Sequence, residues 1–325
     1  MGFMVIKDLK SGEKIDDKFV IRKKELRSRK DSKVKFLSIE FGDSSGRLFG
    51  TLWDKVERTN SKINVGDIVT VKGSVIDWKG RKHISIDSIE PDKAGEEEDK
   101  EGFVPQSDQD VTEMSAHFLA MIDLVKNAYL YQLLKMIFES ESILECFQKA
   151  AAGKLWHHNY AGGLVEHSFN VSQICLKLSE FYTDLDRDLI LTGAMLHDIG
   201  KIKEYNCKGF IDYSDDGRLI GHVTLGYGFV KSFIDRMDEF PESLKLKLMH
   251  LLVSHQGKRE KGSPVEPMTR EAFVLYYADE IDSKLGAFER IYKRENEKGK
   301  SWSSYVKLLN RFLYFGEDEE ESAAE

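Results

Sequence analysis

The sequence predicts two domains of different structural class, a small all-β barrel followed by an all-α domain. Apolar and polar residues alternate through much of the first ninety positions, whereas apolar residues recur every three or four positions after about residue 111. The segment between them, residues 91–110, is acidic and poor in apolar side chains, which is typical of a linker. A chain of 325 residues has room for two modest domains.

Residues 1–90 are expected to form the barrel. Short runs rich in β-branched and aromatic residues, such as 34–41, 67–76 and 83–89, are separated by turns of Gly, Asp and Ser. A helical pattern interrupts them near residues 55–64. Four or five short antiparallel strands with one helix are typical of a small closed barrel of the OB type, which binds nucleic acid in many proteins.

Residues 111–316 are expected to be helical. The periodicity predicts helices near residues 112–140, 164–182, 187–199, 222–238, 242–256, 269–294 and 302–314. Asp110 or Thr112 is expected to cap the first of them. The acidic residues 317–325 are expected to be a disordered tail.

The charges are divided unevenly along the chain. The formal net charge of −8 excludes a wholly basic nucleic-acid-binding protein, yet residues 1–90 hold 20 Lys and Arg against 14 Asp and Glu. The three cysteines are widely spaced and form no CxxC pair, which indicates free thiols. We find neither a signal-peptide pattern nor an apolar run of about 18 residues. We therefore expect a cytoplasmic protein that does not contact membranes.

The helical half holds eight of the nine histidines, and its densest motif is AMLHDIGK at residues 194–201. His197 and Asp198 are adjacent there, and an imidazole beside a carboxylate suits divalent Mn, Fe, Co or Zn. Such an ion polarises phosphoryl oxygens and lowers the pKa of bound water. Lys201 offers a cation for a phosphate oxygen. The motif therefore predicts a metal-dependent phosphohydrolase.

The ordered set His167, His197–Asp198 and Asp279 resembles the H…HD…D signature of the HD superfamily of metal-dependent phosphohydrolases. The resemblance extends over nearly the whole chain to the YhaM-type 3′→5′ exoribonucleases, through HHNYAGGLVEHS (157–168), GH-x3-G (221–226), LLVSHQG (251–257) and the following SPVEPMTREAFVLYYADEIDSKL. It implies an OB-fold before the HD domain. It also implies Mn²⁺-dependent release of nucleotides from the 3′ end of single-stranded RNA, with single-stranded DNA as a second substrate.

The resemblance further implies roles for individual residues. The core metal ligands are expected to be His167, His197, Asp198 and Asp279. A second ion is expected to be held by His222 and His255, with Asp198 as the bridge. Many two-metal HD proteins carry a further histidine after His255, whereas this chain has Gln256, so both one and two ions stay open.

Other residues of the helical half receive expected roles as well. Lys201 is expected to contact phosphate, and Asp198 to accept a proton if a single ion binds. Asp282 lies one helical turn after Asp279 and is expected to hold a ligand or a water molecule. His158 and Asn159 are candidates for lining the substrate entry.

The barrel region is expected to capture the strand. Cations gather between residues 22 and 35, and single strands are held by such cations together with aromatic rings on which bases stack. The predicted substrate-binding residues there are Arg22, Lys24, Arg29, Lys33, Trp53 and Trp78. Phe36 and Phe49 are further aromatic candidates.

Two alternative functions stay open at this point. The first is an HD-domain phosphodiesterase for nucleotides or cyclic dinucleotides, which would have no need of the barrel. The second is a non-catalytic single-strand-binding protein, against which the intact metal ligands argue. A chain with one small barrel could also assemble as a homo-oligomer to surround its substrate.

Overall fold

The structure, a computed structural model, describes residues 5–29, 34–92, 100–154, 156, 158–296 and 300–316. The chain splits into two compact units: Met1–Asp108 with Tyr205–Ser214, and Gln109–Glu204 with Asp215–Glu325. The predicted order of a β-barrel followed by a helical domain is confirmed. The predicted boundaries at residues 90, 110 and 316 stay a prediction, and the acidic tail lies outside the described residues.

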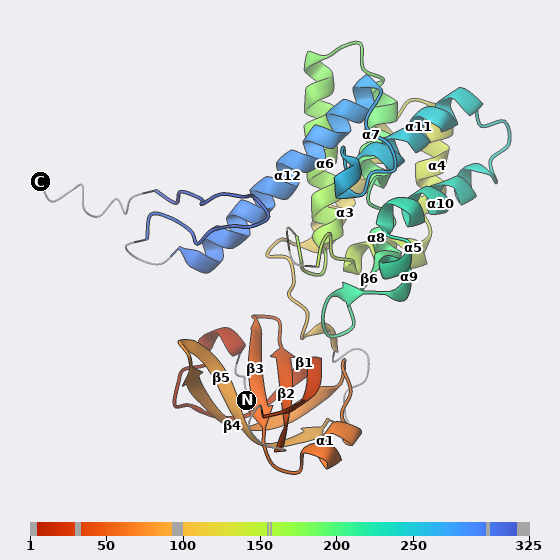
Figure 1. Ribbon diagram of the computed structural model, residues 1–325. Helices are drawn as coiled ribbons and strands as arrows, with labels where there is room; N and C mark the ends of the chain where they lie inside the picture. Colours follow the sequence, from red (N-terminus) through yellow and green to blue (C-terminus); the bar gives the residue numbers. More distant parts are fainter. Residues whose placement is uncertain are drawn as a thin grey trace, which may run out of the picture. The chain divides into compact units, whose positions relative to one another are not determined.

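Five strands close the barrel in the order β1-β2-β3-β5-β4 (Figure 1). Their bounds are β1 (Lys14–Ser28), β2 (Lys35–Gly42), β3 (Arg47–Leu52), β4 (Ile68–Trp78) and β5 (Arg81–Pro91). Strand β1 is long enough to pair antiparallel with both β2 and β4, and the parallel pairing of β3 with β5 completes the barrel. A 3-10 turn, η1 (Ile6–Asp8), precedes β1, and the expected helix, α1 (Val56–Lys62), joins β3 to β4.

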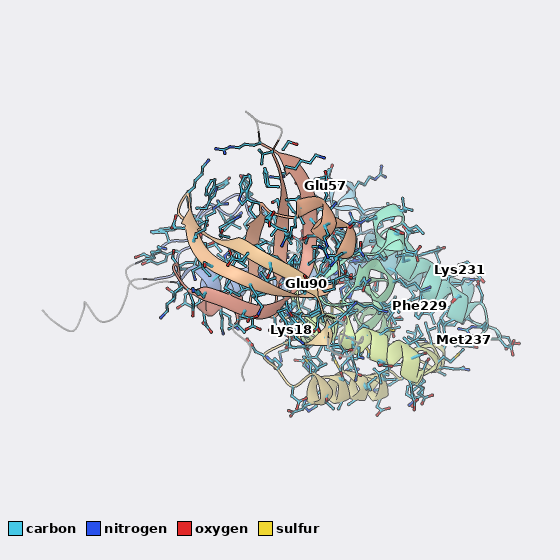
Figure 2. All side chains as sticks on the ribbon, turned by 90° about the horizontal axis from the view of Figure 1, so that it is seen from below. Lys18, Glu57, Glu90, Phe229, Lys231 and Met237 are labelled. Carbon is cyan, nitrogen blue, oxygen red and sulfur yellow. The ribbon has the colours of Figure 1, made fainter. Side chains whose placement is uncertain are left out.

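The barrel interior is filled by alternate strand residues, because successive side chains of a strand point to opposite faces. Phe19, Ile21, Leu37, Ile39 and Phe41 are all fully buried there. Charged side chains cover the outside, among them Lys18, Glu57 and Glu90 (Figure 2), which pair with Asp92, Lys35 and Lys62 respectively.

A short hairpin from the middle of the helical sequence also belongs to the first unit, which the sequence did not predict. Its strands are β6 (Tyr205–Asn206) and β7 (Asp212–Tyr213). The guanidinium of Arg22 lies 4.9 Å from the ring centre of Phe210 at the hairpin's tip. Burial, reinforced by the neighbouring Arg47, lowers the pKa of Arg22 to about 10.

The second unit is helical. Its elements are α3 (Val111–Ala120), η2 (Met121–Leu124), α4 (Ala128–Phe138), α5 (Glu141–Lys149), α6 (Gly163–Phe181), α7 (Arg187–Leu196), α8 (Lys201–Glu204), α9 (Asp215–Leu219), α10 (His222–Ile234), α11 (Glu242–Ser254), η3 (Arg259–Lys261) and α12 (Arg270–Glu295). Helix α6 packs against both α7 and α12 (Figure 1). Asp110 caps α3 as expected, accepting from the backbone N–H groups of Thr112 and Glu113. None of the described helices combines the length and apolarity that crossing a membrane requires.

Two predicted helices were wrong. The stretch 112–140 is interrupted, because the side chain of Asn127 caps a new helix, α4. The stretch 302–314 is not a helix: it folds back on itself through bridges between Trp302 and Tyr314 and between Val306 and Arg311. There the Ser303 hydroxyl accepts from the backbone of Leu313 at 2.8 Å. Serine bonds of this kind compete with the hydrogen bonds of a helix.

Candidate metal centre

Helix ends and helix faces of the second unit bring the predicted ligands together. His167 lies in the first turns of α6, and Asp279 lies near the middle of α12. His197, Asp198 and His255 follow directly after the helices α7 and α11, and His222 opens α10. All of these except His222 are buried, and the His222 side chain is 18% exposed.

One group of ligand atoms surrounds His167. Its Nε2 lies 3.2 Å from Asp279 Oδ1, 3.3 Å from Asp198 Oδ2 and 3.2 Å from His197 Nε2. Two imidazole nitrogens and two carboxylate oxygens therefore face one point. We name His167, His197, Asp279 and Asp198 Oδ2 the first subsite. Divalent transition metals accept such a mixed set of nitrogen and oxygen ligands.

A second group lies on the other side of Asp198. Its Oδ1 lies 3.4 Å from His222 Nε2 and 3.5 Å from His255 Nε2, and these atoms we name the second subsite. Gln256 lies beside it with its amide nitrogen 3.5 Å from His222 Nε2. The two oxygens of one carboxylate thus face two subsites, which is the geometry of a bridging ligand.

The donor atoms fit divalent cations. Asp198 Oδ1 and His255 Nε2 are buried and have no hydrogen-bond partner among the described residues. A buried polar atom left without a partner costs about 1–3 kcal/mol, so two such acceptor atoms side by side fit the binding of a cation. Within the described part of the chain, three groups of histidine and carboxylate side chains have ligand atoms within 4.8 Å of one another, and two of them, His167/His197/Asp279 and Asp198/His222/His255, belong to the subsites.

Backbone carbonyls orient two of the histidines. His197 Nδ1 lies 2.8 Å from the carbonyl oxygen of Ala194, and His255 Nδ1 lies 2.7 Å from that of Leu252. A carbonyl oxygen can only accept, so each Nδ1 must carry the hydrogen. In a neutral ring the lone pair then sits on Nε2 and faces the centre.

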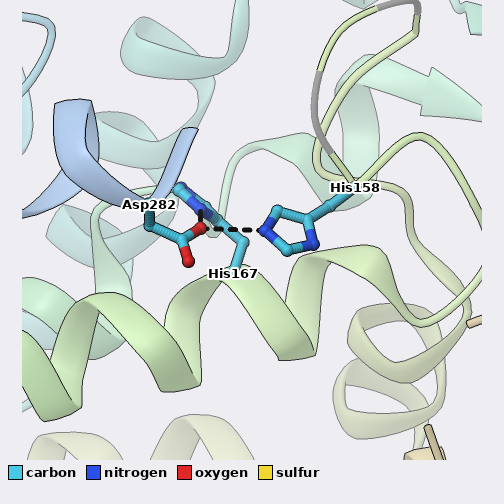
Figure 3. A group of neighbouring side chains, drawn as sticks. All are labelled: His158, His167 and Asp282. Carbon is cyan, nitrogen blue, oxygen red and sulfur yellow. Dashed lines mark hydrogen bonds and ion pairs between the residues drawn. The ribbon is translucent and has the colours of Figure 1, made fainter. Parts of the chain in front are cut away.

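A carboxylate orients His167. Figure 3 shows the rings of His158 and His167 directed at the same oxygen of Asp282, at 2.9 and 2.6 Å. Asn170 donates to the other oxygen of Asp282 at 2.9 Å. On its far side the His158 ring contacts the hydroxyl of Tyr160 at 2.8 Å. The expected supporting role of Asp282 agrees with this placement.

The two residues predicted at the substrate entry are placed differently. His158 is only 7% exposed and is engaged by Asp282 and Tyr160, whereas Asn159 is half-buried. Contact of either residue with substrate stays a prediction.

Lys201 contacts the carboxylate of Asp198, three positions before it in the chain. Its Nζ lies 2.5 Å from Asp198 Oδ2, and only 5% of the residue is exposed. Burial acts to lower the pKa of Lys201, but the attraction of Asp198 outweighs it and raises that pKa. Burial likewise acts to raise the pKa of Asp198, but Lys201 and His197 hold it well below its usual range. Both groups are therefore charged.

Gly200 lets α10 approach the HD motif. A Cβ atom added there would lie 2.0 Å from the carbonyl oxygen of His222 and 2.6 Å from the backbone nitrogen of Gly226. Backbone cannot yield to such an overlap without moving the start of α10. The glycine after His197–Asp198 is therefore needed to place His222 in the second subsite.

Comparisons with known proteins agree with both units. Residues 20–92 match the family model of the OB-fold nucleic acid binding domain, and residues 164–284 match that of the HD domain. The protein named 3′-5′ exoribonuclease YhaM from Shouchella clausii is 30% identical over 305 residues, 93% of each chain. The chain belongs to the YhaM family of 3′–5′ exoribonucleases. It is thus a metal-dependent 3′–5′ exonuclease of single-stranded nucleic acid.

Other YhaM proteins are similar over the same length. The one from Listeria monocytogenes is 28% identical and covers 94% of this chain and 96% of its own. The one from Bacillus subtilis is 28% identical, with 93% and 95% covered. Two solved structures match parts of the chain. The second OB-fold of replication protein A from Methanococcus maripaludis is 26% identical and covers 29% of this chain and 97% of its own, with a TM-score of 0.24. The HD domain of the L. monocytogenes phosphodiesterase PgpH is 16% identical and covers 45% of this chain and 74% of its own, with a TM-score of 0.29.

The predicted strand-binding residues of this YhaM-family chain differ in how they are placed. Arg22 is packed against Phe210 and lies 3.8 Å from Glu40, and Lys24 donates to the carbonyl oxygens of Asn60 and Ile63. Arg29 is exposed, whereas Lys33 lies outside the described residues. The contacts of all four cations with a strand stay a prediction.

Aromatic side chains are exposed on the barrel. Trp53 is 50% exposed and its ring centre lies 4.8 Å from that of Phe36, while Trp78 is 59% exposed. Sequence reasoning missed His83, whose ring centre lies 6.4 Å from that of Trp78 and whose Nε2 contacts the Thr51 hydroxyl at 2.8 Å. A polar histidine in a strand of alternating pattern was the available signal for an outward-facing residue.

Metal binding by this YhaM-family chain is expected to strengthen as the pH rises. Burial acts to lower the pKa of His167, but Asp198, Asp279 and Asp282 together raise it well above its ordinary value. The metal-free protein therefore holds a proton that the first ion must displace, so affinity should rise about tenfold per pH unit below that pKa. Burial lowers the pKa of His255, so metal binding at the second subsite should release fewer protons.

Stability of the metal-free protein should change in the opposite sense. The raised pKa of His167 contributes stability that is complete below the unfolded value of about 6.5 and is lost as the pH rises through the folded value.

Titration calorimetry with Mn²⁺ in buffers of different ionisation heat measures the protons that metal binding releases. Affinity that does not change between pH 6 and 8, without proton release, would contradict the protonated His167.

Proposed function

We propose that this chain releases nucleotides from the 3′ end of single-stranded RNA at a centre of two Mn²⁺ ions. The observation that carries the proposal is the position of Asp198, whose two oxygens each face a separate set of ligands. The first ion would be held by His167, His197, Asp198 and Asp279, and the second by Asp198, His222 and His255.

When bound, the ions would polarise phosphoryl oxygens and lower the pKa of water. The chain's own groups position the substrate and balance charge. His222 and Asp279 are the partly exposed ligands, with side chains 18% and 11% exposed, so the terminal phosphodiester would enter from their side. Lys201 would donate to a non-bridging phosphate oxygen. Asp198 would accept a proton if a single ion is present.

The barrel would capture the strand before cleavage. Exposed Arg29 would attract the phosphate backbone, and bases would stack on the rings of Trp53 and Trp78, largely without regard to sequence. A preference for RNA over DNA requires contacts with the 2′-hydroxyl. The homo-oligomer and the cytoplasmic location stay predictions.

The central test uses single-stranded RNA labelled at its 5′ end, incubated with Mn²⁺. A ladder that shortens from the 3′ end is the expected result, with an Asp198→Ala variant inactive and DNA of the same sequence degraded more slowly. Cleavage of cyclic dinucleotides alone would overturn the proposal in favour of a small-molecule phosphodiesterase. Binding of RNA without any cleavage would favour a non-catalytic role.

Replacing Mn²⁺ by Mg²⁺ or Zn²⁺ in the same assay tests the identity of the metal. Equal cleavage rates with all three ions would contradict the proposed preference for Mn²⁺.

Trp53→Ala is expected to weaken binding of single-stranded RNA about 5- to 150-fold, because stacking of one base on an aromatic ring contributes about 1–3 kcal/mol. Fluorescence anisotropy with a labelled strand measures the dissociation constant in the presence of EDTA, so that cleavage cannot interfere. The matched control is Trp302→Ala, which removes a similarly exposed tryptophan (57%) from the second unit. Equal loss in both variants would contradict a base contact at Trp53.

A further inference from the structure

A second supporting carboxylate, Glu204, lies beside the metal centre and has no role in the mechanism above. It is the last residue of α8 and is only 5% exposed. Its Oε1 lies 3.1 Å from the backbone nitrogen of His222 and 3.1 Å from Nδ1 of the same residue. Its Oε2 is buried and has no hydrogen-bond partner among the described residues.

This pair of contacts fixes both the backbone and the ring of His222. The backbone N–H is at the first position of α10, where no carbonyl of the helix itself can accept it. Gly221 precedes it and provides no side-chain cap. A carboxylate accepts from the ring as well, so Nδ1 carries the hydrogen and Nε2 faces Asp198 Oδ1 at 3.4 Å. Among the described residues, Glu204 is the acceptor at Nδ1 of this ring, whereas Gln256 approaches its Nε2 only at 3.5 Å.

The two subsites are therefore supported separately. Asp282 of α12 orients His167 in the first subsite, and Glu204 of α8 orients His222 in the second. The other histidine of each subsite is held by a backbone carbonyl, which substitution of a side chain cannot remove. Loss of a supporting carboxylate typically weakens metal binding about 10- to 100-fold.

We infer that Glu204 is a positioning residue that controls the loading of the second metal subsite through His222, independently of the first. The inference rests on the two-ion centre proposed above. It predicts that the protein binds metal in two separate steps. A substitution at Glu204 should weaken one binding step, and a substitution at Asp282 should weaken the other.

The test measures Mn²⁺ binding to the full-length protein by equilibrium dialysis, with free Mn²⁺ read by electron paramagnetic resonance. Wild-type protein should bind two ions. Glu204→Met, which keeps the side-chain volume but removes the acceptor, should weaken one step about 10- to 100-fold and leave the other unchanged. Glu204→Gln should largely restore binding because its amide oxygen still accepts from His222. The matched control, Asp282→Leu, which removes the acceptor that faces His167, should weaken the other step.

The resonance spectrum gives a second measure. Two Mn²⁺ ions that share the Asp198 carboxylate should give an exchange-coupled signal in wild-type protein, and Glu204→Met should show uncoupled Mn²⁺ at the same metal concentration. Wild-type affinities and coupling in Glu204→Met would overturn the inference. So would equal weakening of both steps with a lower melting temperature in EDTA, which indicates a merely structural role.

The proposed function and the inference can fail separately. Wild-type protein that binds two ions but leaves RNA intact would contradict the exonuclease and leave the role of Glu204 standing. Wild-type protein that shortens RNA while binding a single ion would overturn the inference and retain the exonuclease.

Discussion

Asp198→Asn is expected to lower the rate of RNA shortening by at least about 10³-fold. The carboxylate offers one oxygen to each subsite, whereas an asparagine has one oxygen and an amino group that cannot bind a cation. Metal ions contribute several kcal/mol to stabilising charge in the transition state, and about 1.36 kcal/mol corresponds to a tenfold change in rate. Quenched-flow assays on labelled RNA at saturating Mn²⁺ measure the rate.

The matched control for Asp198→Asn is Glu280→Gln. Glu280 neighbours the candidate ligand Asp279 in the chain, but its side chain is 21% exposed and its carboxylate pairs with the exposed Lys261 and Lys284. The same loss of one carboxylate charge should therefore leave the rate within a few-fold of wild type, because surface pairs contribute only about 0–1 kcal/mol. An Asp198→Asn protein that keeps a tenth of the activity, or a Glu280→Gln protein that loses as much, would contradict the assigned centre.

The fold class and the candidate ligands could be predicted because their signals are local or chemically unusual. Alternation and helical periodicity follow from side-chain direction in strands and helices. A histidine beside an aspartate in an apolar helix, as at His197–Asp198, has no common packing explanation. The ordered ligands that follow in the chain then needed only a helical domain to bring them together.

The supporting residues could not be predicted in the same way. Glu204 lies 18 residues from His222 in the chain, and in sequence it resembles any solvated glutamate of a charged helix end. The hairpin at 205–214 shows no strand-like run long enough to be distinguished from a loop. Arg22 and Lys24 were predicted from charge alone, yet their partners, Phe210 and the end of α1, are set by tertiary packing. Long-range contacts of this kind leave no local pattern.

Removal of the Lys201 charge is expected to destabilise the metal-free protein far more than the metal-loaded protein. In Lys201→Met the carboxylate of Asp198 loses its 2.5 Å partner, and breaking a buried ion pair on one side costs about 3–5 kcal/mol. Bound Mn²⁺ would supply positive charge at the same carboxylate, so the loss should shrink when metal is present. Urea denaturation in EDTA and in excess Mn²⁺ measures the two free energies of unfolding.

The loss in Lys201→Met should be constant between pH 6 and 8. The lowered pKa of Asp198 contributes stability that is present above the unfolded value of about 3.9 and lost as the pH falls through the folded value. The raised pKa of Lys201 contributes stability that is present below about 10.4 and lost as the pH rises through the folded value. Both contributions are complete between these two unfolded pKa values, a window that includes pH 6 to 8.

The control is Lys203→Met, which lies two positions further along the chain and is exposed. It should change the free energy of unfolding by less than about 0.5 kcal/mol. Equal losses with and without Mn²⁺ would contradict the prediction that Lys201 balances the charge of a carboxylate that binds metal.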